Sequence, residues 1–112
     1  MNVGRPVEEV VREGFRRVLG DVSLKVLEYH FDKLLGMDPA EALFREPKAF
    51  YETLNKFFKA GTDILLETVL KTIFLDIYRV NINVKDVLLA IKSGEVNKVH
   101  NLLLGSEKLV KL

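Results

Sequence analysis

The sequence contains no cysteine and no tryptophan among its 112 residues. Without cysteine the chain cannot form disulfides, use a thiolate nucleophile or build the thiolate zinc sites that stabilise many small domains. Glutamine is also absent, whereas lysine and glutamate are common. This bias is found in heat-adapted proteins, because amides and thiols degrade on heating. The composition therefore predicts a thermostable protein without covalent cross-links.

An excess of charge of one sign is missing as well. The 17 basic and 16 acidic side chains leave a formal net charge of +1, so no overall field attracts the protein to nucleic acid or to an anionic membrane. The richest apolar stretch, residues 63–80, is interrupted by Glu67, Lys71 and Asp76, whereas a membrane span needs about 18 apolar residues in a row. The first residues lack the apolar run of a signal peptide. These features predict a cytoplasmic protein with no membrane span.

What the sequence does contain is a strong helical pattern. Hydrophobic residues make up 48% and charged residues 29% of the chain, as is typical of a globular domain. Apolar residues recur at steps of three and four, the spacing of amphipathic helices. We predict an all-α, compact single-domain bundle of five to seven helices over residues 1–112. The main bundle is expected at about 6–79 and a C-terminal helical hairpin at 84–105, followed by a tail that is frayed or lightly docked.

Capping residues mark several of the predicted helix starts. Asp21 or Ser23 can cap the second helix. Two acid-proline pairs follow, Asp38-Pro39 and Glu46-Pro47. An acidic side chain can accept a hydrogen bond at a helix start, and proline suits the first helical position because that position needs no amide hydrogen. We interpret both pairs as helix starts rather than as a loop that presents a ligand.

The helix predicted for residues 62–79 is apolar around most of its circumference. Its polar residues form only a narrow strip, and either Thr62 or Asp63 can cap its start. Such a helix must be covered on most sides, either at the centre of the bundle or, in part, by a second copy of the chain. We therefore predict a homodimer. The candidate interaction surface consists of Phe57, Phe58, Ile73, Phe74, Ile77 and Tyr78.

Few residues suggest catalysis or metal binding. His30 and His100 are the two histidines, and neither has a second histidine or an acid four residues away to complete a metal site. Glu67 lies in an apolar helix, where a buried carboxylate can act as an acid or base, but Lys71 one turn away favours an ion pair. No phosphate-binding, nucleophile-elbow or zincin motif is present. We predict no enzyme activity, no metal and no cofactor.

Residues from about 7 to 72 follow a pattern of helix boundaries and apolar positions. It comprises a glycine-ended helix, a second helix with V-x-x-x-I-x-x-x-L spacing, a proline after an acidic linker, F-x-x-x-L-x-x-x-F, a glycine, and a helix with a glutamate. The matching residues are Leu19, Gly20, Val22, Val26, His30, Pro47, Phe50, Leu54, Phe57 or Phe58, Gly61 and Glu67. In this pattern the chain resembles the archaeal family called the Nitrosopumilus output domain. The resemblance implies a helical archaeal module that acts downstream in signalling or regulation, without catalytic activity.

We therefore expect a non-catalytic protein-interaction or regulatory module that self-associates and binds a protein partner. The alternative is a helix-turn-helix regulator that binds nucleic acid, with Arg12, Arg16 and Arg17 as phosphate contacts. A third hypothesis is a small-molecule pocket among the phenylalanines.

Overall fold

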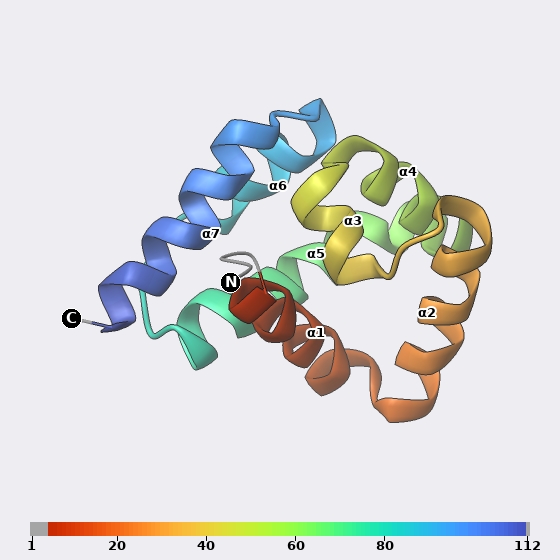
Figure 1. The fold of residues 1–112 in the computed structure, drawn as a ribbon, viewed down its shortest axis with the longest axis horizontal. Helices are drawn as coiled ribbons and strands as arrows, with labels where there is room; N and C mark the ends of the chain where they lie inside the picture. Colours follow the sequence, from red (N-terminus) through yellow and green to blue (C-terminus); the bar gives the residue numbers. More distant parts are fainter. Residues whose placement is uncertain (1–4, 112) are drawn as a thin grey trace.

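All regular structure in the described part of the chain is helical (Figure 1). The computed structural model describes the backbone of residues 5–111 and the side chains of residues 7–105. The α-helices are α1 (Arg5–Leu19), α2 (Asp21–Leu35), α3 (Pro39–Arg45), α4 (Pro47–Phe58), α5 (Thr62–Lys71), α6 (Val84–Ser93) and α7 (Val96–Lys111). A 3₁₀ turn, η1 (Lys59–Gly61), precedes α5, and a π-helical segment, η2 (Thr72–Ile77), follows it. The predicted all-α bundle is confirmed.

The two acid-proline pairs start α3 and α4, as predicted. Asp38 Oδ1 accepts a hydrogen bond of 2.8 Å from the backbone N–H of Glu41, and Pro39 lies in the first turn of α3. Glu46 makes no side-chain cap, so α4 starts with Pro47 alone. The first pair therefore uses both the acidic cap and proline, and the second uses only proline.

The turn between α1 and α2 differs from the prediction. Gly20 is the N-cap of α2, with φ 86° and ψ 167°, and it is followed directly by Asp21 as the first helical residue. The expected cap by Asp21 or Ser23 is therefore wrong. Glycine adopts a positive φ at little cost, so a single residue connects the two helices and no position is left for a polar cap.

Phe50 of α4 lies at the centre of the core. Its ring centroid is 6.0 Å from that of Phe15 in α1 and 5.9 Å from that of Phe31 in α2. All three side chains are fully buried, and aromatic pairs at such distances add about 0.5–1.5 kcal/mol each beyond the burial of their area. Aliphatic side chains complete the core: Leu43, Leu54, Leu66, Leu70, Ile73, Val87, Ile91, Val99 and Leu103. One hydrophobic core therefore joins α1 to α7.

The segment predicted as one α-helix over residues 62–79 changes its hydrogen bonding halfway. α5 ends at Lys71, and in η2 the N–H of Tyr78 donates to the carbonyl of Ile73, five residues back, at 2.9 Å. Gly14 of α1 faces this segment so closely that a Cβ atom on it would lie 2.6 Å from Ile73 Cγ1. The predicted helix is therefore continuous from Thr62 to Ile77, although its last six residues are π-helical, and α1 packs directly on η2.

The apolar side of α5 and η2 is covered by the chain's own helices. Leu66, Val69, Leu70, Ile73 and Phe74 are each at most 1% exposed. This outcome agrees with the first of the two alternatives, in which the segment lies at the centre of the bundle.

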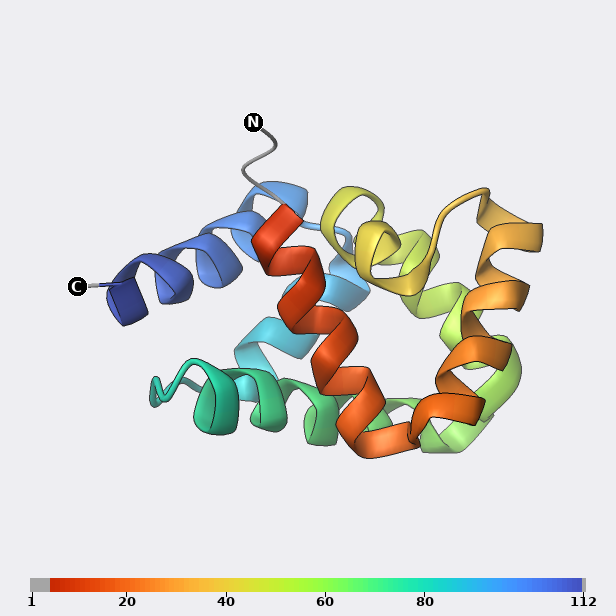
Figure 2. The same ribbon diagram turned by 60° about the horizontal axis from the view of Figure 1, so that its bottom comes forward.

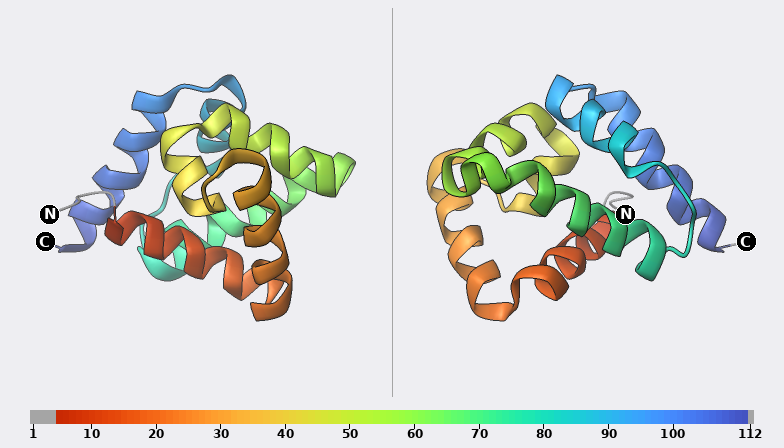
Figure 3. Two further views of the ribbon diagram at one scale, coloured as in Figure 1. Left: turned by 45° about the vertical axis from the view of Figure 1, so that its right-hand side comes forward. Right: turned by 180° about the vertical axis from the view of Figure 1, so that it is seen from behind.

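α2 and α7 lie at opposite ends of the molecule (Figures 1 and 2). Seen from behind, α5 and η2 run across the molecule between them (Figure 3). α2 buries Leu24, Leu27 and Phe31 in the core, and its half-buried Leu35 packs against the core as well. The backbone of α7 is helical through Gly105 to Lys111, and the expected light docking of the tail falls on side chains outside the described residues. The position of α2 at one end leaves one of its sides without a covering helix.

Candidate interaction surface on helix α2

Three of the six residues predicted to form an interaction surface are buried in the core. Ile73 and Phe74 are 0% exposed and Tyr78 is 4% exposed, because α1 packs on η2. Ile77 is half-buried. A partner cannot reach Ile73, Phe74 or Tyr78 in the folded protein, so the prediction is wrong for these three residues.

The other two predicted residues, Phe57 and Phe58, form one wall of an apolar groove between α4 and α2. The groove has a volume of about 290 Å³. Its lining residues are Leu19, Val22, Ser23, Val26, Leu27, His30, Phe57 and Phe58. The His30 ring is half-buried and lies against Phe57, with the two centroids 5.0 Å apart. Because the lining is almost entirely apolar, the groove suits a nonpolar partner surface better than a polar ligand.

The side of α2 that faces away from the core is apolar as well. Val22, Val26 and Tyr29 are 77%, 52% and 58% exposed, and steps of four and three residues place them on one face of the helix. Lys33 is the next residue on that face, and its Nζ lies 5.4 Å from the Tyr29 ring centroid, within the range of a cation–π contact. We call Val22, Val26, Tyr29 and Lys33 the α2 stripe. This stripe was not among the surfaces predicted from the sequence.

The arginines predicted as alternative phosphate contacts are all bound to carboxylates. Arg12 Nε donates to Glu28 Oε2 at 2.7 Å, and Arg16 and Arg17 both donate to Glu13, at 2.7 and 2.9 Å. The hydrogen bonds from Arg16 and Arg17 lower the pKa of Glu13 to about 2. At each arginine a phosphate would therefore compete with a carboxylate for the guanidinium. Nucleic-acid binding through them stays a prediction, which salt-dependent retention on DNA would test.

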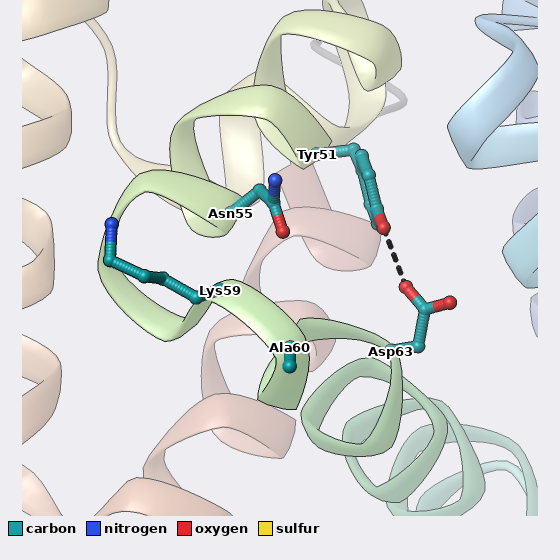
Figure 4. Close-up of a pocket in the computed structure, with 5 residues that line it drawn as sticks. All are labelled: Tyr51, Asn55, Lys59, Ala60 and Asp63. Carbon is teal, nitrogen blue, oxygen red and sulfur yellow. Dashed lines mark hydrogen bonds between the residues drawn. The ribbon is translucent and has the colours of Figure 1, made fainter.

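A second, polar hollow lies between α4 and α5 (Figure 4). It has a volume of about 450 Å³ and is lined by Tyr51, Asn55, Lys59, Ala60 and Asp63. Tyr51 Oη donates to Asp63 Oδ1 at 2.6 Å, and the bond is drawn in Figure 4. On the other carboxylate oxygen, Lys92 Nζ of α6 donates to Asp63 Oδ2 at 2.9 Å. The cluster therefore ties α4, α5 and α6 together.

The hydrogen bonds of this cluster stabilise the ordinary protonation state of each group. Those from Tyr51 and Lys92 lower the pKa of Asp63, and the same contacts raise the pKa of Tyr51 and of Lys92. The carboxylate stays ionised, the phenol neutral and the amine charged near neutral pH. None of the three is poised to exchange a proton there.

The remaining candidate residues are His100 and Glu67. His100 stacks on Phe44, with ring centroids 3.9 Å apart, and its Nε2 is hydrogen-bonded to the Phe44 carbonyl. The ion pairs of the described residues do not include one between Glu67 and Lys71, so that predicted pair is wrong. In the same part of the chain, no three His, Cys, Asp or Glu side chains are grouped as a metal site would require.

No helix among the described residues combines the length and the apolar character that a bilayer span requires.

The chain is similar in sequence to an archaeal protein. An uncharacterised protein of Archaeoglobus fulgidus is 36% identical to this chain over 75 residues. The alignment covers 67% of this chain and 60% of that relative, so the chain spans about 60% of the relative's length. No family model matches the chain, and no solved structure matches it. Similarity to an archaeal protein is therefore shown, whereas membership of the Nitrosopumilus output domain family stays a proposal.

Proposed function

We propose that this protein is a non-catalytic interaction module that self-associates through the α2 stripe. The observation that carries the proposal is the exposure of Val22, Val26 and Tyr29 along one helix face. Phe57, which is 41% exposed, lies beside Val22 and Val26 at the apolar groove. Contiguous exposed apolar side chains mark contact sites in soluble proteins. The occupant that we propose for this face is a second copy of the chain.

The charges of α2 support a second copy as the partner. Lys25 and Asp32 are both exposed and lie seven residues apart, on the same flank of the helix beside the stripe. When two copies of α2 pack antiparallel, Lys25 of each lies close to Asp32 of the other. The net charge of +1 adds almost no repulsion between copies.

A pair of lysine substitutions tests the proposal. Val26→Lys places a charge in the middle of the stripe, whereas Leu89→Lys places one on α6, where Leu89 is 59% exposed against 52% for Val26. We expect sedimentation velocity to show dimers for the unaltered protein and for Leu89→Lys, and monomers for Val26→Lys at the same concentration. Circular dichroism of all three must show the same helix content. Equal sedimentation of all three proteins would contradict the proposal.

We also propose the regulatory role that the resemblance to output domains implies. Its support is the similarity to an uncharacterised archaeal protein. The cytoplasmic location and the thermostability stay predictions of the sequence.

A further inference from the structure

We infer that the two copies pack their α2 helices antiparallel, in one register that the α2 stripe defines. The inference rests on the proposed self-association and adds its geometry. The first observation is the spacing of the four residues of the α2 stripe. Residues 22, 26, 29 and 33 follow one another at steps of four, three and four, which is the a/d pattern of a coiled coil. The three apolar members are at least half exposed and Lys33 is exposed too, so the pattern lies on the surface and not in the core of this chain.

The register follows from the identity of the four residues. In an antiparallel pair, a and d positions of opposite helices form shared layers. Val26 then lies opposite Tyr29 of the second copy, and this layer occurs twice at the centre. Val22 lies opposite Lys33 of the second copy, and this layer occurs once at each end. The aliphatic stem of Lys33 can cover Val22 while its ammonium group stays in water. The resulting seam has valine and tyrosine at its centre and a lysine stem at each end.

A parallel pair would place like residues together. Lys33 would then lie opposite Lys33 of the second copy within the seam, and two ammonium groups in one layer repel each other. The antiparallel register separates the two lysines by the length of the seam. It also brings Lys25 close to Asp32 of the second copy on the flanking g positions, which adds two weak ion pairs. Spacing, side-chain size and charge therefore agree on one orientation.

The other flank of the seam includes the edge of the apolar groove. Ser23 and His30 occupy the e positions there, and both line the groove together with Phe57. Neither Ser23 nor His30 carries a carboxylate or a permanent positive charge that would repel its counterpart. Packing of the second copy on the stripe therefore also removes groove-lining apolar surface from water, which strengthens the contact.

Cysteine cross-linking reads the register directly, because the natural sequence contains no cysteine. Two single variants, Val22→Cys and Lys33→Cys, are prepared separately, mixed in equal amounts, and treated with a short bis-maleimide cross-linker. We expect cross-linked dimers in the mixture and their loss when either variant is treated alone, because residue 22 lies opposite residue 33 only between antiparallel copies. Leu89→Cys mixed with Lys33→Cys serves as the control, and it should give no dimers.

Other results would overturn either the register alone or the self-association as well. Cross-linking of Val22→Cys with itself would show a parallel pair and would overturn the register. Light scattering that shows dimers, combined with no cross-link in the mixture, would also overturn the register while leaving self-association intact. A monomeric mass for both variants and for the unaltered protein would overturn the proposed function together with the register.

A charge exchange provides a second, independent measurement. Lys25→Asp and Asp32→Lys each place like charges opposite one another, so each variant alone should dimerise more weakly than the unaltered protein. In a mixture of the two variants the charges are complementary again, and we expect the dimer to return as a heterodimer. Equal dimerisation of the mixture and of the separate variants would overturn the Lys25–Asp32 contact.

Discussion

Gly14 determines how closely α1 approaches η2. A Cβ atom at this position would lie 2.6 Å from Ile73 Cγ1 and 3.1 Å from its Cδ1. Gly14→Ala gains about 0.5–1 kcal/mol in helix propensity, but overpacking a buried contact costs about 1–3 kcal/mol, so the overpacking is the larger effect. We predict a net loss of about 1 kcal/mol in the free energy of unfolding, measured by urea denaturation.

The matched control for Gly14 is Gly105 in α7, where nothing lies within 4 Å of the added Cβ atom. Gly105→Ala should therefore stabilise the protein by up to about 1 kcal/mol, since only the propensity term applies. Equal effects of the two substitutions would contradict the close approach of α1 to η2.

The two acid-proline pairs allow a similar comparison at the level of single residues. Asp38 caps α3 with a hydrogen bond to Glu41, whereas Glu46 makes no cap. Asp38→Ala should lower the free energy of unfolding by about 0.5–2 kcal/mol, and Glu46→Ala should leave it nearly unchanged. Denaturant midpoints of the two variants measure the difference. A larger loss for Glu46→Ala would show that the capping account is wrong.

At the scale of single residues, local chemistry could be predicted and tertiary contacts could not. The cap by Asp38 depends on neighbours three residues away, so the sequence alone contains the information. The burial of Phe74 and Tyr78 depends on the packing of α1 against η2. An apolar residue looks the same in a sequence whether it faces the core or a partner, and that is why these residues were assigned to a surface.

At the scale of elements, the cluster of Tyr51, Asp63 and Lys92 joins three helices and makes stability depend on pH. The folded state lowers the pKa of Asp63 below its ordinary value of 3.8, so the cluster stabilises the fold above that value and the contribution is lost as the pH falls through the lowered pKa. We predict that Asp63→Asn costs about 1 kcal/mol at neutral pH, in the range of an exposed ion pair with one added hydrogen bond.

The pH dependence of stability distinguishes the effect of this cluster from a general effect of losing one negative charge. The difference between Asp63→Asn and the unaltered protein should shrink towards zero in urea titrations at decreasing pH below 3.8. Glu52→Gln, which removes an exposed carboxylate of α4 outside the cluster, should show a much smaller difference at neutral pH. A constant difference for Asp63→Asn at every pH would contradict the proposed cause.

The elements also show why the α2 stripe was missed. α2 carries one apolar set, Leu24, Leu27 and Phe31, that faces the core, and a helix was expected to have one such set. Val22, Val26 and Tyr29 form a second set on another face, and a separate count of each face would have revealed it. The change from α to π at Thr72 has no such signal in the sequence.

For the molecule as a whole, the helical fold could be predicted because its spacing and its helix starts agree along the chain. The homodimer was predicted for a different reason from the one that now supports it. Apolar excess in residues 62–79 suggested a partner. The bundle buries most of this segment and leaves Ile64 and Leu75 exposed, whereas α2 carries three exposed apolar side chains on one face, Val22, Val26 and Tyr29. A contact through one short helix is small beside the roughly 1,600 Å² of a standard interface, so we expect weak, micromolar association.

The most direct test of the account is the mass of the unaltered protein in solution. We predict that static light scattering over a series of concentrations shows the average mass rising from the 12.8 kDa of one chain towards twice that value at high micromolar concentration. Dilution should reverse the rise. A mass that stays at that of one chain at the highest concentration would contradict self-association through the α2 stripe.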